Sequence, residues 1–206
     1  MAEKSTTWDD IRVIALQKMF LIEGSEVEYN DSTKPYIAAM PAAYNEAVRL
    51  LSTTNRYIVK CADIECGGLS NQLRINLDET IPDLYELKPN GIYFEYPDGR
   101  MAECGEQYSI GNNILVLPGN AIGMYHIYYY AYPITATATM PGTTNLQIDP
   151  DVASLIPLYM ASQLYKDDDI AIATTYRNEF EVGRDLLVRE LNGSMSQRFH
   201  SVTGWW

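Results

Sequence analysis

The feature that most constrains the fold is helical periodicity at both ends of the chain, separated by a middle region that lacks this periodicity. Apolar side chains repeat at spacings of three and four residues over 8–22 and 31–51, and again over 149–165 and 169–192. Each helix has one apolar face that it cannot bury alone. We therefore expect an α+β chain in which the N- and C-terminal segments form a four-helix bundle around the same core.

Local signals predict where these helices begin and end. Thr7 followed by an acid three positions later is typical of a capping box, and Asp149 with Pro150 predicts the start of the third helix. The acids 167–169 are expected to open the last helix, and Gly193 to end it. The predicted buried stripes are Ile11, Ile14, Ala15, Met19 and Ile22; Ile37, Met40, Tyr44, Ala47 and Leu51; Val152, Leu155, Ile156, Tyr159, Met160 and Leu164; and Ala173, Tyr176, Phe180, Gly183 and Leu187.

The middle of the chain is rich in Val, Ile, Tyr and Thr, and turn sequences divide it into short runs. We expect an inserted, sandwich-like domain of six to eight antiparallel strands, with a hairpin around the turn 97–100 and an alternating strand over 124–131. The predicted organisation is helices over 1–54, the β insert over 55–148, helices over 149–192 and an extended C-terminal tail over 193–206.

Charge and composition exclude several functions. The formal net charge of -12 argues against a groove that grips phosphate, although DNA could pass nearby without being held. Three cysteines and no secretory type of leader favour synthesis in a reducing cytoplasm. Because no apolar run approaches the roughly 18–20 residues of a membrane span, we expect no membrane partner.

Few patterns indicate catalysis, so we expect neither an enzyme nor a bound cofactor. The acids 167–169 lack calcium-loop spacing and are interpreted as helix caps. Cys61, Cys66, Cys104 and His126 could build a zinc site, but their spacing favours thiols in the core. There is no nucleophile turn for a hydrolase around either histidine, and the acidic pairs on the β insert are expected to be solvated.

Two sets of aromatic residues are candidate contact sites. Tyr93, Tyr96, Tyr128 and Tyr130 in the β insert form a possible contact face, which leaves a carbohydrate-binding module on a helical scaffold as the alternative function. The C-terminal tail is the stronger candidate, because its apolar groups would expose on the order of several hundred Å² if it docked nowhere. Its proposed docking residues are Arg198, Phe199, His200, Val202, Trp205 and Trp206.

The C-terminal quarter resembles a known protein family. The run 155–169, the stretch 176–181 and the ending 199–206 are similar to the C-terminal helices and tails of tailed-bacteriophage head-to-tail connector proteins, the portal adaptors or head-completion proteins. The β insert departs from the smallest members, which are little more than a helical bundle.

That resemblance implies a virion structural protein, made in the host cytoplasm and located in the neck between capsid and tail. It implies a ring, usually of twelve subunits, that docks on the portal protein through its C-terminal tail. The other side of the ring would meet the next tail component, while double-stranded DNA passes through an acidic lumen without specific binding.

Overall fold

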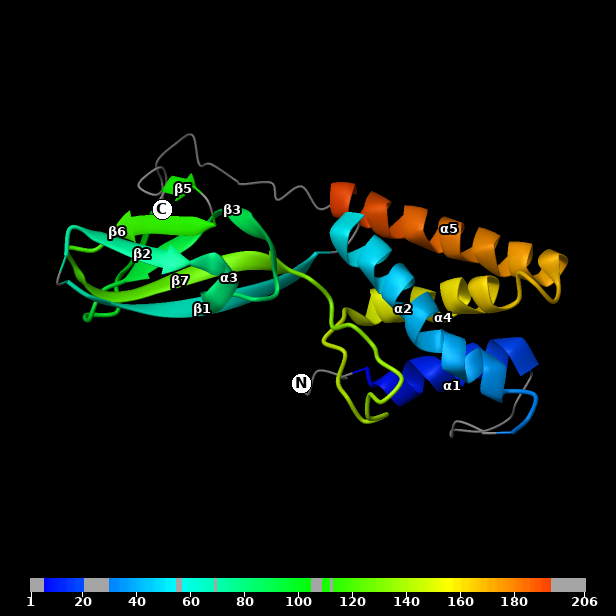
Figure 1. The fold of residues 1–206 in the computed structure, drawn as a ribbon. Coiled ribbons are helices and arrows are strands. Elements are labelled where there is room, and N and C mark those ends of the chain that lie inside the picture. Colours follow the sequence, from blue (N-terminus) through cyan, green and yellow to red (C-terminus); the bar gives the residue numbers. More distant parts are fainter. Residues whose placement is uncertain are drawn as a thin grey trace. The chain divides into compact units, whose positions relative to one another are not determined.

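A computed structural model describes residues 6–20, 30–54, 57–68, 70–104, 109–111 and 113–193. The chain divides at residues 56 and 134 into two compact units, so that both ends of the chain belong to one unit and its middle to the other. The helical unit contains α1 (Trp8–Phe20), α2 (Lys34–Thr54), α4 (Pro150–Leu164) and α5 (Ile170–Gly193) (Figure 1). The expected α+β organisation, with a β region inserted between the N- and C-terminal helices, is confirmed.

Helix α4 is the central element of the helical unit, because it packs against α1, α2 and α5. A helix with three neighbours must be apolar around most of its circumference. Its buried residues accordingly include Val152, Ile156, Met160 and the small Ala153 and Ala161. The stripe predicted on α2 is confirmed throughout, since all five of its members are buried.

Within the described residues, the stripe predicted on α1 is wrong at one position, and its last member, Ile22, lies outside those residues. Ile14 is 39% exposed, whereas Trp8 and Leu16 are buried together with Ile11 and Met19. The large Trp8 ring packs edge-on against Tyr44 at 5.1 Å between ring centroids. Burial of Trp8 and Leu16 centres the buried face of α1 away from Ile14, which then points to solvent.

The capping signals are confirmed at three helix starts. The Thr7 amide donates to Asp10 at 2.9 Å and the Asp10 amide to the Thr7 hydroxyl at 3.3 Å, as in a capping box. Asp149 accepts from the Asp151 amide at 3.0 Å, and Asp169 from the Ala171 amide at 2.9 Å. These side-chain oxygens satisfy amides that have no partner within their helices.

Two tyrosines near the α4–α5 turn bind the last turn of α1. The Tyr165 hydroxyl donates to the Met19 carbonyl, and the Tyr176 hydroxyl donates to the Lys18 carbonyl. Carbonyls in the last turn of a helix have no partner within the helix, so both hydroxyls complete its hydrogen bonding from elsewhere in the chain.

The segment 135–148, expected within the insert, belongs to the helical unit. The Asn45 side chain on α2 exchanges two hydrogen bonds with the Ala136 backbone, at 2.8 and 3.0 Å. Leu146 is fully buried, and the Trp8 amide donates to the Thr144 carbonyl at 3.0 Å. These contacts hold the segment against α1 and α2.

The β unit consists of two antiparallel sheets with one shared core. One sheet has the order β1 (Ile58–Gly67), β7 (Ile122–Ala131), β3 (Leu84–Glu95) and β4 (Met101–Glu103). The other has the order β2 (Gln72–Asn76), β6 (Ile114–Pro118) and β5 (Ser109–Gly111), and a short α3 (Leu77–Thr80) follows β2. The core joins both sheets through Ile75, Ile92, Phe94, Leu115, Leu117, Tyr125 and Ile127.

Two local predictions for the β unit are confirmed. Strands β3 and β4 form the hairpin around the turn 97–100, with Tyr93 opposite Glu103. Along β7 the burial alternates, with Tyr125, Ile127 and Tyr129 buried and the residues between them partly exposed. Within the described residues, no helix has the length and apolar character to span a membrane.

Candidate functional site

The proposed docking tail, 193–206, begins at Gly193, the last residue of α5. Its six candidate residues, Arg198, Phe199, His200, Val202, Trp205 and Trp206, lie outside the described residues, so their role stays a prediction. Helix α5 itself has two different faces. Its inner face buries Ala173, Phe180 and Leu187, while Val182 and Leu186 on its outer face are 63% and 53% exposed.

Three of the four candidate tyrosines in the β unit are partly exposed on the outer face of the four-stranded sheet, which points away from the shared core. Tyr93 packs edge-on against Tyr128 at 5.8 Å between ring centroids, and Tyr130 stacks on Tyr57 at 4.4 Å. Tyr96 lies on the core side, where it packs against Phe94 at 4.9 Å. Tyr96 directly follows the end of β3 and packs against the core, so Tyr93 and Tyr96 do not join one surface.

A pocket of about 430 Å³ lies beside the Tyr93–Tyr128 pair. The β3–β7 register shifts between Leu87 and Ile92, and Asn90 adopts a positive φ of 54°. A β-carbon on Gly91 would lie 2.8 Å from the Lys88 carbonyl oxygen, so this bulge requires glycine. The pocket is lined by Lys88, Asn90, Gly91, Tyr93, Met101, Glu103 and Tyr128.

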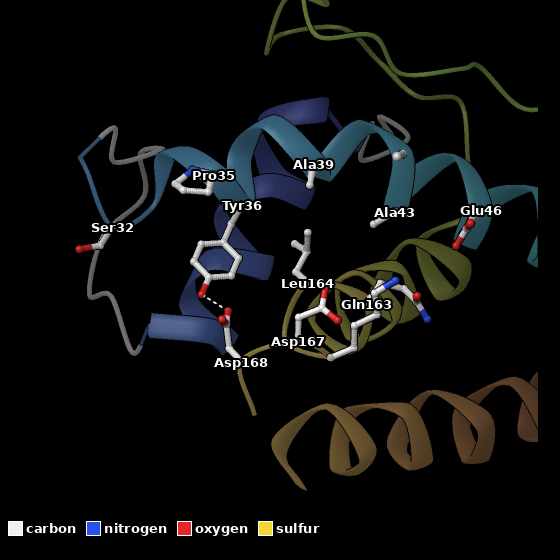
Figure 2. Close-up of a pocket in the computed structure, with 12 residues that line it drawn as sticks. Ser32, Pro35, Tyr36, Ala39, Ala43, Glu46, Gln163, Leu164, Asp167 and Asp168 are labelled. Atoms are coloured by element: carbon white, nitrogen blue, oxygen red, sulfur yellow. Dashed lines mark hydrogen bonds between the residues drawn. The ribbon is translucent and has the colours of Figure 1, made fainter. Parts of the chain in front are cut away.

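The helical unit has a groove of about 590 Å³ between α2 and the end of α4 (Figure 2). Its floor includes the small residues Pro35, Ala39 and Ala43, and Tyr36 donates a hydrogen bond to Asp168 at one end. The acids at its edge and the single Lys166 do not suit a phosphate ligand. Of the acids 167–169, Asp169 caps α5 as predicted, whereas Asp167 and Asp168 lie in the turn before that helix, where Asp168 accepts the hydrogen bond from Tyr36.

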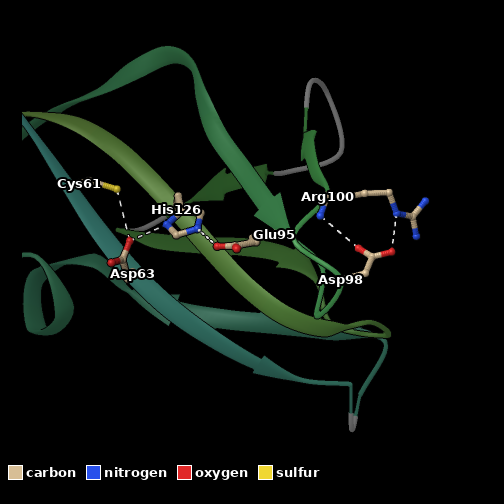
Figure 3. Close-up of polar contacts among 6 residues, drawn as sticks. All are labelled: Cys61, Asp63, Glu95, Asp98, Arg100 and His126. Carbon is tan, nitrogen blue, oxygen red and sulfur yellow. Dashed lines mark hydrogen bonds and ion pairs between the residues drawn. The ribbon is translucent and has the colours of Figure 1, made fainter.

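A polar cluster on the outer sheet face joins three adjacent strands (Figure 3). Asp63 of β1 lies opposite His126 of β7, and its carboxylate is 2.7 Å from Nδ1 of the imidazole. Glu95 of β3 lies 2.8 Å from Nε2 on the other side of the ring. The Cys61 thiol donates to Asp63 at 3.5 Å.

The charges in this cluster favour a protonated imidazole. Hydrogen bonds to Glu95 and Asp63 raise the pKa of His126, and the hydrogen bond from His126 lowers the pKa of Asp63. Partial burial and the neighbouring Asp63 raise the pKa of Cys61 to about 11. A neutral imidazole has one N–H, so contact with both carboxylates requires a second proton or another cation.

The four-residue zinc site considered from the sequence is not assembled. Cys66 and Cys104 are buried in the core, as predicted for thiols in an apolar interior, but the prediction that Cys61 is a core thiol is wrong. Cys61 is exposed beside Asp63 and His126. Sequence reasoning considered Asp63 only in a pair with Glu65 and did not connect Asp63 or Glu95 with His126, because only the strand register brings them together.

Comparison with models of known protein families finds no match for this chain, and comparison with curated proteins finds none either.

Proposed function

We propose that this chain is a virion structural protein, a head-to-tail adaptor that assembles into a ring. In this proposal the ring, of about twelve subunits by resemblance, docks on the portal protein and meets the next tail component on its other side. The helices would form a four-helix bundle and the insert a sandwich, while the tail would extend to the portal. The virion neck would then be its location, after synthesis in the host cytoplasm.

The packing of the C-terminal helices is the observation that carries this proposal. Within the described residues, the runs that resemble connector proteins lie in α4, in the turn that follows it and in α5. Helix α4 packs against α1, α2 and α5. The resemblance therefore falls on the central element of the helical unit. Helix α5 reaches Gly193, where the proposed docking tail begins.

Exposed side chains on α5 supply a candidate contact between neighbouring subunits. Val182 and Leu186 are four residues apart, so they lie side by side on the helix, and more than half of each is exposed. In a ring, each subunit contacts the next through two different surfaces. An apolar pair on the outside of the last helix suits such a contact.

The charge balance supports passage of DNA without binding. The chain has 27 acidic and 15 basic residues. Carboxylates in a lumen repel phosphates, and affinity for duplex DNA depends on clustered Lys and Arg. We propose that DNA slides through the ring instead of being held.

Removal of the tail is expected to abolish portal binding without unfolding the helices. A chain ending at Leu191 retains nearly all of α5, including the buried Phe180 and Leu187, so its circular dichroism should match that of the full chain. Its binding to portal rings of the same phage should fall by at least about 100-fold, or roughly 2.7 kcal/mol. Circular dichroism measures whether the helices remain folded. Electron microscopy of the mixture and binding to surface-immobilised portal rings measure the loss of docking.

A matched pair of variants localises the effect. Trp205→Ala with Trp206→Ala should reproduce most of the loss, because aromatic anchors concentrate interface energy, while Ser201→Ala with Thr203→Ala should bind like the full chain. Undiminished binding by the chain ending at Leu191 would overturn the tail assignment. A full-length chain that stays monomeric and ignores the portal would overturn the adaptor proposal.

The pocket beside Tyr93 and Tyr128 favours a second candidate function, carbohydrate binding. It combines aromatic rings with the polar Lys88, Asn90 and Glu103, which are the groups that contact sugars. On a glycan array this candidate predicts binding by the full chain that Tyr128→Ala lowers by about tenfold. Tyr132→Ala, at an exposed tyrosine outside the pocket lining, is the control. The adaptor proposal expects no sugar binding by any of these chains.

A further inference from the structure

The cluster around His126 contains the ligand atoms of a transition-metal site. Cys61 and Asp63 are two residues apart on β1, so their side chains share the outer sheet face, and His126 lies directly opposite Asp63 on β7. The thiol sulfur, a carboxylate oxygen and a ring nitrogen all lie within 4.8 Å of one another. Two neighbouring strands with fixed register thus hold three donor atoms of different chemistry together.

Glu95 completes the arrangement from the far side of the ring. Its carboxylate lies 2.8 Å from Nε2, so an Nε2–H can donate to Glu95. When the proton between Nδ1 and Asp63 is released, the lone pair of Nδ1 faces the Asp63 and Cys61 side. Metal-bound histidines usually donate their other N–H to a carboxylate in this way, which fixes the tautomer and makes the nitrogen a better ligand. Glu95 is therefore a positioning residue for Nδ1 and not itself a ligand.

We propose that Cys61, Asp63 and His126 bind a Zn²⁺-like transition-metal ion on the outer face of the four-stranded sheet. Sulfur, nitrogen and oxygen donors together suit Zn²⁺ or Co²⁺ and do not suit Ca²⁺ or Mg²⁺, which prefer oxygen alone. Three protein ligands leave a fourth tetrahedral position for water or another small ligand. Asp63 is 57% exposed, so that position opens to solvent.

The spacing between Nδ1 and Asp63 needs only a small adjustment to accept the ion. Two ligands at about 2.0 Å from a tetrahedral metal are about 3.3 Å apart. The Nδ1–Asp63 distance of 2.7 Å must therefore lengthen by about half an ångström, which rotation of the exposed Asp63 side chain can supply. Binding releases the thiol proton and the proton between Nδ1 and Asp63, so the ion replaces hydrogen bonds that already join the same groups.

Co²⁺ titration of the full chain tests this proposal under reducing conditions. The expected result is one ion per chain, with visible bands typical of a tetrahedral site and a near-ultraviolet thiolate charge-transfer band. Zn²⁺ should displace Co²⁺ and remove both. The charge-transfer band identifies a cysteine ligand directly, which a structural role for these residues would not produce.

Variants assign the ligands. Cys61→Ser should remove the charge-transfer band and Asp63→Asn should weaken binding, while Glu95→Gln should lower affinity by about 10- to 100-fold with the band retained. Two controls should bind like the full chain: Glu103→Gln, an acid on β4 outside the cluster, and His200→Asn, which removes the other histidine. Circular dichroism confirms that each variant is folded.

Two outcomes would overturn the proposal. One is an absence of saturable Co²⁺ binding by the folded full chain at concentrations up to about 1 mM, which corresponds to a binding free energy of only about 4 kcal/mol. The other is an unchanged charge-transfer band in Cys61→Ser, because the metal would then sit on Cys66 or Cys104.

Discussion

Replacement of Phe180 by alanine is expected to lower the free energy of unfolding of the helical unit by about 3–5 kcal/mol. Phe180 is fully buried on the inner face of α5, and its ring packs edge-on against Tyr159 of α4 at 5.0 Å between centroids. Truncation removes the apolar contact area and leaves a cavity in the α4–α5 interface. Because α4 also packs against α1 and α2, the whole helical unit should lose stability.

Chemical denaturation followed by far-ultraviolet circular dichroism measures this effect. Ile170→Ala is the matched control, since Ile170 lies on the same helix with a relative exposure of 75% and should change stability by less than about 0.5 kcal/mol. Hydrogen exchange adds a second readout. Amides of α4 and α5 should lose protection in the Phe180 variant, whereas those of β1 and β7 should keep theirs. A loss of less than about 1 kcal/mol would contradict the predicted role of Phe180.

Replacement of Gly123 by alanine is expected to destabilise the β unit by about 2–3 kcal/mol. A β-carbon at Gly123 would lie 2.2 Å from the Glu95 carbonyl oxygen and 2.6 Å from the Phe94 ring. The carbonyl belongs to the backbone of β3, so rotation of a side chain cannot relieve the contact. Strand β3 must move away from β7, which weakens the central pairing of the sheet.

Gly111→Ala is the matched control, because a β-carbon there meets no described atom within 4 Å. It should change stability by no more than about 0.5 kcal/mol. Thermal unfolding of the two variants, followed by near-ultraviolet circular dichroism of the tyrosines, compares them directly. Equal midpoints for the Gly123 and Gly111 variants would show that the sheet accommodates the methyl group.

Features that depend on neighbours in sequence were predicted well. The caps at Thr7 and Asp149 involve atoms two or three residues apart, so the residue types suffice to identify them. The buried stripe of α2 follows from helical periodicity alone, and Ile14 was misplaced because Trp8 and Leu16 decide which way α1 faces. Periodicity shows that a helix has an apolar stripe, but packing against the neighbouring helices decides which residues lie at the centre of the buried face.

The candidate sites also differ in whether neighbours in sequence are enough to identify them. Alternation along a strand correctly groups Tyr128 with Tyr130. Packing of Tyr96 against Phe94 and the core, just after β3, separates it from Tyr93. The cluster at His126 could not be found in this way, because Asp63 lies 63 residues from it and Glu95 lies 31 residues from it. Residue type marks these groups as potential ligands, and only pairing between strands makes them neighbours.

By itself, the sequence determined that helices at both chain ends enclose a β region, where three of those helices begin, and which α2 residues are buried. These features follow from backbone propensity and from repeats of three, four or two residues. The tertiary structure alone decided that Tyr165 and Tyr176 complete the last turn of α1, that Asn45 holds Ala136, and that three strands bring Asp63, His126 and Glu95 together. Such contacts join groups far apart in the chain, and their geometry is set by how whole elements pack.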